Sequence, residues 1–592
     1  MNDVKWDLSQ LVKSTDQSDI VKELDALVEE AGMRAAEYRG KIKTLDAKGL
    51  KALFEEREQM QLKYEGVIMY SRLRYSADTT DVVSRQLNDA VSKAGTKVGQ
   101  QLAFVEIELS HLLKARPELV KDPVLAEFRH ALDRTLRAAP YLLSEEEEKI
   151  IMAKDQNGAN AWSQLQREWL STRTFPIEIE GKRKRLPYGQ IIGLYGSPDR
   201  QLRRDANRIV YGRLGKDEII WSSALRSICD DHLQNCDLRK YPTPETSSLI
   251  YNDVEPEAIE AMMTTMKDNV GVYRKYLKLK AEMMDLDRLG NWDIMAPLPK
   301  APKMTFTWDQ AHETVVKAYG GFDPQLGEWA EDMYQKQHID GAVRPGKVSG
   351  AFCSDWYGGK SAYVLQSFNG RLDDVYTQQH EMGHSMHAYL ASRAQRATNT
   401  SISFCIAECG SIFGELLLTD HLIGNAKDVK EKQAVLTQVM DGFGQAAFQV
   451  SARYFFEKSL YQAIRDGKYL DGETISALWV KARDDVYGDA VELLPEMKWE
   501  WTMKMHYYIP ELRYYNYPYV FAQLFVFSMY RLYQEQGKVF VPKFKGLLSA
   551  GSSRSAAELA AGLGFDIGKE TSWQKGIAQA EAFIEELEGT LK

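Results

Sequence analysis

The chain has 592 residues, of which 44% are hydrophobic and 27% are charged, an ordinary composition for a globular protein with more than one domain. Its net charge of −9 argues against binding of nucleic acid, and no apolar run reaches the length of a membrane span. The five cysteines do not suggest a disulfide framework, and the first residues contain no apolar signal segment, so we expect a cytoplasmic protein.

Helical periodicity dominates residues 1–170. Apolar residues keep one stripe over residues 53–67 and a second over residues 83–105, where Asp78 and Asp81 are possible N-caps. Four consecutive glutamates follow Ser144, as in the first turn of a helix. These patterns predict long amphipathic helices that pack as hairpins.

The period changes over residues 174–187, where alternation predicts a short β-hairpin. The basic run Lys182 to Arg185 is interpreted as a solvated turn. Helical periodicity then resumes and continues to the C-terminus. We therefore predict a mainly α protein with an N-terminal helical domain over residues 1–195 and a second domain over residues 196–592.

Residues 380–384 read His-Glu-Met-Gly-His, the most informative motif of the chain. On a helix, His380 and His384 project from one face and can bind one metal ion. Glu381 points toward the same side and can act as a general base on a metal-bound water. Asp373 or Asp374 can cap this helix. The motif predicts a zinc-dependent peptidase with one zinc ion per chain.

A catalytic zinc site needs a third protein ligand and an open position. Metzincins would place glycine and histidine at positions 387 and 390, but this chain has His387 and Leu390. Glu408, 24 residues after His384, lies among apolar residues, where an unpaired carboxylate is costly. Glu408 is therefore the predicted third ligand.

Three further groups near these ligands have other predicted roles. Glu415, two turns after Glu408, can orient a ligating histidine, and His387 can support the site or contact substrate. Cys405 and Cys409 flank Glu408 but are interpreted as small buried helix residues.

A strand signal over residues 361–370 lies just before the metal-binding motif. A strand beside a metal-binding helix can offer its edge to an extended peptide, although an ordinary sheet strand gives the same pattern. On the first interpretation Tyr363, Leu365 and Ser367 bind substrate. A small β-sheet beside the motif's helix is expected on either interpretation.

The segment 505–519 is rich in tyrosine and contains His506. Such clusters often serve packing, but peptide hydrolysis builds negative charge on the attacked carbonyl oxygen, which O–H or N–H donors stabilise. His506 and one or two of these tyrosines are candidates for that role.

Taken together, these residues resemble the oligoendopeptidase F branch of the thimet oligopeptidase family. The resemblance covers most of the chain and combines the HExxH motif and Glu408 with the tyrosine segment. It also includes the segments Trp6–Leu11, Ser197–Arg200, Trp292–Pro299 and Ser349–Cys353.

The resemblance implies a mostly helical, two-lobed body that encloses a deep channel, with zinc at its floor. It implies cleavage inside short unstructured peptides, with Glu381 as base and with His506 and Tyr515 as transition-state donors. Which of Tyr515, Tyr517 and Tyr519 faces the zinc stays open, and the other two are candidate substrate contacts.

Two rival functions remain. A helical zinc metallocarboxypeptidase would need a cation for the terminal carboxylate of its substrate, and Arg513 is a candidate. A non-catalytic scaffold would bind oligopeptides without turnover, but the intact Glu381 speaks against it. The expected partners are oligopeptide substrates, with no nucleic acid and no membrane, and the sequence does not fix the oligomeric state.

Overall fold

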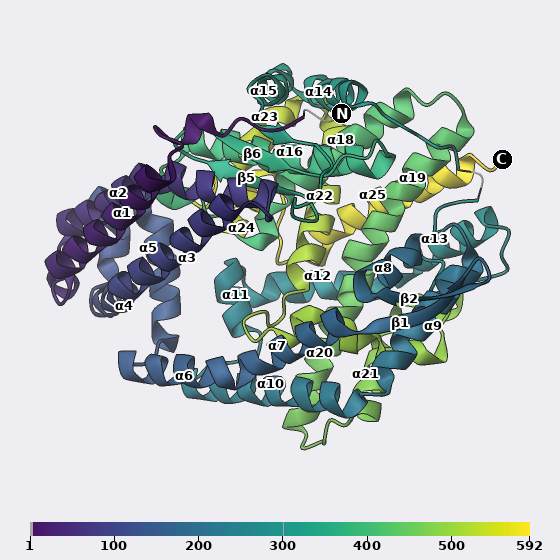
Figure 1. Ribbon diagram of the computed structural model, residues 1–592, viewed down its shortest axis with the longest axis horizontal. Coiled ribbons are helices and arrows are strands. Elements are labelled where there is room, and N and C mark those ends of the chain that lie inside the picture. The colour runs from purple at the N-terminus through teal and green to yellow at the C-terminus, as the bar shows by residue number, and fades with distance from the viewer. Residues whose placement is uncertain (1–3, 300) are drawn as a thin grey trace. The chain divides into compact units, whose positions relative to one another are not determined.

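The computed structural model describes residues 4–299 and 301–592 of the chain (Figure 1). The chain divides into two compact units, each assembled from three stretches of sequence. Unit 1 comprises Met1–Leu142, Lys303–Asn425 and Leu532–Phe565, and unit 2 comprises Leu143–Pro302, Ala426–Arg531 and Asp566–Lys592. This division differs from the predicted boundary near residue 195, because the N-terminal helices form one compact unit with residues 303–425.

Helices make up most of both units, as predicted. The α-helices of unit 1 are α1 (Gln17–Tyr38), α2 (Ala47–Ala77), α3 (Val82–Leu102), α4 (Phe104–Ala115), α5 (Arg129–Ala138), α14 (Trp308–Phe322), α15 (Pro324–Gln335), α16 (Leu372–Ala394), α17 (Phe404–Ala407), α18 (Cys409–Gly424), α23 (Val541–Ser549) and α24 (Ala556–Gly562). Those of unit 2 are α6 (Glu145–Asn157), α7 (Ala159–Thr172), α8 (Tyr188–Gly193), α9 (Arg200–Gly215), α10 (Glu218–Arg239), α11 (Thr246–Asn252), α12 (Pro256–Asp268), α13 (Val270–Met283), α19 (Val429–Phe443), α20 (Val450–Arg465), α21 (Gly472–Tyr487) and α25 (Glu570–Gly589). Helix α22 (Tyr517–Gln536) begins in unit 2 and ends in unit 1. Among the described residues, no helix is both long and apolar enough to cross a membrane.

The predicted helix boundaries agree with the side-chain caps. The carboxylate of Asp81 accepts a hydrogen bond from the backbone N–H of Ser84 at the start of α3. Ser144 and Glu147 form a capping box at the start of α6, whose first turn holds the four glutamates. The hairpin over residues 174–187 is also confirmed, as β1 (Thr174–Ile179) and β2 (Lys182–Pro187). The basic run lies in strand β2 and not in the turn, but it is exposed as predicted.

The sheet of unit 1 has three strands in the order β4, β6, β5. β6 (Ser361–Leu365) pairs in parallel with β4 (Ile339–Asp340) and antiparallel with β5 (Phe352–Trp356). Tyr363 and Leu365 project into a core shared with α1, α2 and α3. Helix α16 packs against β5 and β6 (Figure 1), so the predicted small sheet does lie beside the motif's helix.

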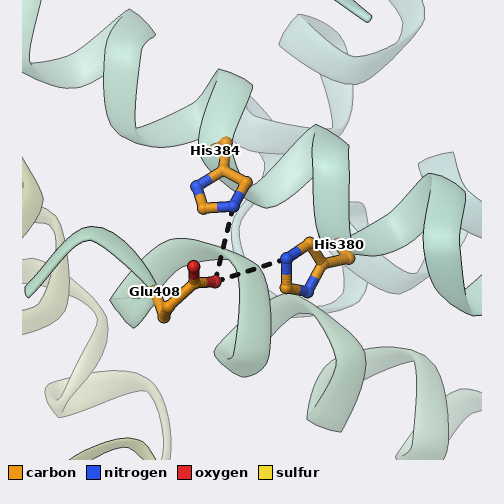
Figure 2. A group of neighbouring side chains, drawn as sticks. All are labelled: His380, His384 and Glu408. Carbon is orange, nitrogen blue, oxygen red and sulfur yellow. Dashed lines mark ion pairs between the residues drawn. The ribbon is translucent and has the colours of Figure 1, made fainter. Parts of the chain in front are cut away.

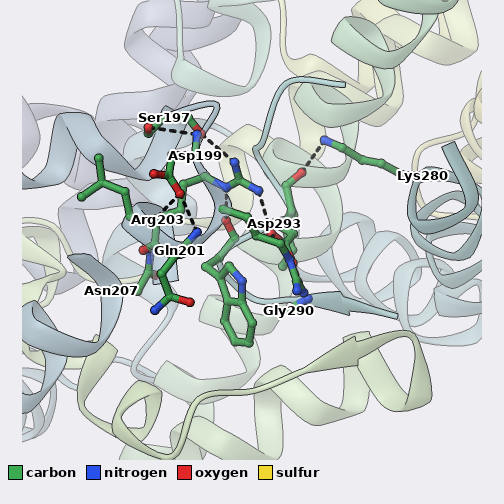
Figure 3. A network of polar contacts seen from close by, with 12 residues as sticks. Ser197, Asp199, Gln201, Arg203, Asn207, Lys280, Gly290 and Asp293 are labelled. Atoms are coloured by element: carbon green, nitrogen blue, oxygen red, sulfur yellow. Dashed lines mark hydrogen bonds and ion pairs between the residues drawn. The ribbon is translucent and has the colours of Figure 1, made fainter. Parts of the chain in front are cut away.

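In unit 2, two segments noted in the sequence join in one buried network (Figure 3). The carboxylate of Asp293, fully buried, accepts hydrogen bonds from Arg200 and Arg203 at 2.8 Å each. Arg203 also donates to the carbonyl oxygens of Ser197 and Trp292. These contacts hold the Ser197–Arg200 and Trp292–Pro299 segments together, because Arg200 and Arg203 both neutralise the buried carboxylate of Asp293. Unit 2 also contains the short parallel pair β3 (Leu289–Gly290) and β7 (Val491–Glu492).

Candidate active site

Helix α16 carries the HExxH motif and begins at a tight turn. Gly370 has φ +81°, a conformation that favours glycine, and Arg371 is the N-cap. Asp374 accepts hydrogen bonds from the backbone N–H groups of Asn369 and Arg371, both at 2.9 Å. Of the two acids proposed as caps, Asp374 makes these contacts, and it does so from inside the first turn. The turn fixes where α16 begins, and the helical repeat then sets the face on which the histidines lie.

His380, His384 and Glu408 converge in unit 1 (Figure 2). One carboxylate oxygen of Glu408 lies 3.3 Å from Nε2 of His380 and 3.4 Å from Nε2 of His384. The potential ligand atoms of the three residues all lie within 4.8 Å of one another. The three predicted ligands are therefore brought together, and we call them the metal-ligand cluster.

Glu408 reaches the histidines because α16 and α18 approach each other unusually closely. A Cβ atom on Gly383 would lie 2.4 Å from the carbonyl oxygen of Gly410, and a Cβ atom on Gly410 would lie 2.4 Å from that of Gly383. Only glycine fits at both positions, since real Cβ atoms do not come this close to backbone oxygen. Gly410 follows Glu408 by two residues, so the contact brings the carboxylate to the α16 face that carries the motif.

Further hydrogen bonds fix the cluster. The hydroxyl of Ser411 donates to the carboxylate of Glu408 at 2.6 Å. Nδ1 of His380 lies 2.5 Å from a carboxylate oxygen of Glu415, the contact expected of a residue that orients a ligating histidine. Sequence reasoning found Glu415 but assigned no role to Gly383, Gly410 or Ser411, and the glycine inside the motif was the available signal.

The electrostatics of the cluster favour a cation. Burial alone would lower the pKa of His380, but the carboxylates of Glu408 and Glu415 raise it well above its usual value. Burial would raise the pKa of Glu408, but hydrogen bonds with His380 and His384 hold it well below its usual range. Burial raises the pKa of Glu381, which is 7% exposed, and the two histidines oppose this rise.

His387 is 2% exposed, and burial lowers its pKa to about 3. Its ring lies by the backbone of Ala407, the residue before Glu408. A substrate contact by His387 does not fit this burial, whereas support for the loop that carries Glu408 does. Cys405 and Cys409 are buried, as predicted.

The substrate contacts expected from residues 361–370 need correction. β6 is the central strand, and the side chains of Tyr363 and Leu365 are fully buried in the core. They cannot contact a peptide without disrupting that core. The edge strands of the sheet are β4 and β5, and in β5 the side chains of Cys353 and Asp355 lie within electrostatic range of Glu381 and His384, respectively. The role of Ser367, which is half-buried beyond the end of β6, stays a prediction.

The tyrosine segment, residues 505–519, lies in unit 2. His506 belongs to the 3-10 helix Met505–Tyr508, and Tyr515 lies just before α22. The ring centroids of His506 and Tyr515 are 6.2 Å apart. The hydroxyl of Tyr519 donates to that of Tyr515 at 2.6 Å, because residues four apart meet on one side where the helix begins. His506, Tyr515 and Tyr519 therefore form one group.

Tyr517 is separated from that group. Its side chain is fully buried, and its hydroxyl accepts hydrogen bonds from Ser248 at 3.2 Å and Asn252 at 3.1 Å. The predicted substrate contact by Tyr517 does not fit this position, which is a packing position. The contact predicted for Tyr519, whose side chain is 39% exposed, stays a prediction.

Arg513 also has an internal role. It is 4% exposed, and one terminal nitrogen donates to the carbonyl oxygens of His506, Tyr507 and Ile509 at 2.7–2.9 Å. The guanidinium therefore closes the loop between His506 and α22, and it does not offer a free cation to a substrate carboxylate.

The model of Peptidase family M3 matches residues 194–579, and the model of Oligopeptidase F matches residues 110–175. The chain belongs to peptidase family M3. Peptidases of this family are metallopeptidases, which agrees with the metal-ligand cluster. The larger match begins next to the boundary predicted near residue 195, although the compact units are discontinuous.

Relatives extend over nearly the whole chain. Oligopeptidase PepF of Bacillus subtilis is 22% identical over 577 residues, which cover 96% of this chain and 85% of the relative. The fold is similar to that of a putative peptidase from Chlamydophila abortus, with a TM-score of 0.88, 20% identity and coverage of 99% and 98% of the two chains. It is also similar to that of oligoendopeptidase-F from Enterococcus faecium, with a TM-score of 0.72, 20% identity and coverage of 97% and 99%.

Proposed function

We propose that this M3 peptidase is a zinc-dependent oligoendopeptidase that binds one zinc ion per chain and hydrolyses internal bonds of short unstructured peptides. The observation that carries the proposal is the convergence of two imidazole nitrogens and one carboxylate within 4.8 Å. This donor set is one that catalytic zinc sites use, with a further position left for water or substrate. The carboxylates around His380 supply the negative field that a divalent cation requires.

His380, His384 and Glu408 would hold the metal, with Glu415 and Ser411 fixing the orientation of two of these ligands. Bound zinc supplies a Lewis acid that polarises the substrate carbonyl and lowers the pKa of water. Glu381 accepts the proton of the attacking water and returns it to the leaving amine. Its raised pKa suits this task, because a base must be able to hold the proton before releasing it.

Two further groups complete the proposed mechanism. The edge strand β5 binds the backbone of an extended peptide by main-chain hydrogen bonds, a role that the buried strand β6 cannot take. His506 and Tyr515 donate hydrogen bonds to the carbonyl oxygen as it becomes negative. The hydroxyl of Tyr519 supports Tyr515, since an incoming hydrogen bond makes Tyr515 a stronger donor.

The engagement of Arg513 inside unit 2 favours an endopeptidase over a carboxypeptidase, because it removes the cation suggested for a terminal carboxylate. The intact Glu381 favours catalysis over a binding scaffold. We also propose a cytoplasmic location and oligopeptides, not nucleic acid, as the partners.

The test uses a quenched fluorescent peptide blocked at both ends. An endopeptidase cuts it and a carboxypeptidase does not, and a chelator should stop the cleavage. Glu381→Gln should lower kcat by about 10²–10⁴-fold, the contribution of a positioned base, while zinc content after dialysis stays at one per chain. Glu313→Gln, at an exposed acid of α14 in the same unit, is the matched control and should leave both unchanged.

Failure to cut the blocked peptide, combined with release of C-terminal residues from an unblocked one, would select the carboxypeptidase. Peptide binding without any turnover would select the scaffold.

For substrate size, an unfolded peptide should be cut while the same segment inside a stable folded protein survives.

A further inference from the structure

The ring of His506 makes one side-chain hydrogen bond within the described part of the chain. Its Nε2 lies 3.1 Å from Nδ2 of Asn516, and Nδ1 has no hydrogen-bond partner among residues 4–299 and 301–592. Burial lowers the pKa of His506 well below its usual value, and the charges of Arg453, Arg513 and Lys504 lower it further. The ring is therefore neutral, with a proton on one nitrogen only. The hydrogen-bond partner of Nε2 therefore determines which ring nitrogen of His506 carries the proton.

Asn516 can face Nε2 with either its amide nitrogen or its amide oxygen. The amide oxygen would require a proton on Nε2, whereas the amide nitrogen donates to a bare Nε2 and leaves the proton on Nδ1. Asn516 is 3% exposed, so solvent does not decide between the two orientations. A second neighbour of Asn516 must therefore select one of the two orientations.

That neighbour is Glu457 of α20, which is 1% exposed. One of its carboxylate oxygens accepts a hydrogen bond from the backbone N–H of Tyr514 at 2.9 Å, and the other is buried without a hydrogen bond. Asn516 lies beside this carboxylate and stabilises its charged form, as a donor does. Burial raises the pKa of Glu457 to about 7, against the charge of Arg513, so at about pH 8 the carboxylate is mainly ionised.

An ionised carboxylate can only accept hydrogen bonds. It therefore turns the amide nitrogen of Asn516 toward itself, because the amide oxygen there would be repelled. The same nitrogen carries a second hydrogen, which is available for Nε2 of His506.

The backbone shows how firmly this arrangement is held. Tyr514 has φ +52°, a left-handed conformation that non-glycine residues rarely adopt. Glu457 accepts the N–H of this residue, and Arg513 ties the preceding turn to three carbonyl oxygens. These contacts place Asn516 between Glu457 and His506.

We propose that Glu457 and Asn516 are positioning residues that set the tautomer of His506, so that Nδ1 carries the proton and Nε2 does not. Nδ1–H is then the donor that His506 offers to the developing oxyanion. The functional part of this inference rests on the proposed role of His506 in peptide hydrolysis, whereas the tautomer itself is a property of the folded chain.

The tautomer is measured by ¹⁵N NMR of the full-length zinc-loaded enzyme labelled at histidine, at about pH 8. His506→Phe identifies the two resonances of His506 by their loss. The expected spectrum places Nδ1 among protonated nitrogens and Nε2 among unprotonated ones. The reverse assignment, or an even mixture of both tautomers, would overturn the proposal.

Two variants connect the tautomer to catalysis. Glu457→Gln should lose the single tautomer, because a glutamine amide can donate as well as accept and no longer fixes which atom of Asn516 faces Nε2 of His506. Its kcat should fall several-fold at similar KM and zinc content. Glu457→Gln combined with Asn516→Asp differs from that variant at one residue and avoids two adjacent carboxylates. The new carboxylate accepts from Nε2, so the tautomer should reverse, and kcat should fall by about 10²–10³-fold at similar KM and zinc content.

A fall in kcat with an unchanged tautomer would show that Asn516 has only a structural role and would overturn the inference. The proposed function fails separately, if His506→Phe itself retains normal kcat.

Discussion

The metal-ligand cluster of unit 1 and the tyrosine segment of unit 2 are held by different means. The histidines of the cluster lie on α16 and Glu408 directly precedes α18, and the backbones of these two helices nearly touch at Gly383 and Gly410. The tyrosine segment has little regular structure before α22, and buried side chains of α20 and of the segment itself, Glu457 and Arg513, hold it in place.

The difference shows two ways to fix a reactive group. Helical geometry places His380 and His384 by sequence spacing alone, and the close approach of α16 and α18 at Gly383 and Gly410 then adds Glu408. A loop places its groups through a few buried polar contacts, each of which is costly to lose. We therefore expect defects in unit 1 to affect metal binding and defects in unit 2 to affect turnover with the metal retained.

The largest effect should come from His384→Ala. It removes one of three metal ligands, so zinc content after dialysis and peptide hydrolysis should both be lost. His421→Ala, on α18 but outside the cluster, is the matched control and should retain both. Retention of one tightly bound zinc per chain in His384→Ala would show that the ligands have been assigned wrongly.

The next largest effects should come from His506→Phe and Tyr515→Phe. Each removes a donor that acts in the transition state, so kcat and kcat/KM should fall together by about 10²–10³-fold. KM and zinc content should change little, in contrast to His384→Ala. Normal kcat in both variants would mean that the tyrosine segment serves packing alone.

The comparison also explains which features were predictable from sequence. His380, His384 and Glu408 were predictable because a helical repeat and an acid among apolar residues are local signals. The stripes of α2 and α3 and the capping box of α6 were predictable for the same reason. Gly383 was visible in the motif, but its partner Gly410 is defined by the packing of two helices, which no local pattern contains.

Features that depend on tertiary contacts were missed or misassigned. Tyr363 belongs to a central strand because residues before it in the sequence supply both neighbouring strands. Tyr517 is separated from Tyr515 and Tyr519 because α22 begins between Tyr515 and Tyr519, whereas an extended loop would have placed all three side chains on one side. The discontinuous units could not be foreseen, since segments far apart in sequence build each of them.

A smaller effect is expected from Gly383→Ala. The new methyl group would lie 2.4 Å from the carbonyl oxygen of Gly410, so α18 must move and take Glu408 away from the histidines. Overpacking of this kind costs about 1–3 kcal/mol, which would raise the Kd for zinc by about 5–150-fold if the metal site carries that cost. Competition with a chromogenic chelator measures the Kd. Gly424→Ala at the end of α18, where a Cβ meets no atom within 4 Å, should leave it unchanged.

The smallest effect should separate packing from chemistry within the tyrosine segment itself. Tyr517→Phe removes a buried hydroxyl that accepts hydrogen bonds from Ser248 and Asn252, and Asn252 keeps its bond to the carbonyl oxygen of Ser248. The variant should therefore lose about 1 kcal/mol of stability, seen as a lower thermal transition, while kcat stays within about two-fold of wild type.

Tyr519→Phe should behave in the opposite way, because its hydroxyl is on an exposed side chain and donates to Tyr515. Its stability should be unchanged, and kcat should fall several-fold as Tyr515 becomes a weaker donor. A large loss of kcat in Tyr517→Phe with normal kcat in Tyr515→Phe would keep the proposed chemistry but move the donor to Tyr517. That outcome would require the buried ring of Tyr517 to leave its site during turnover.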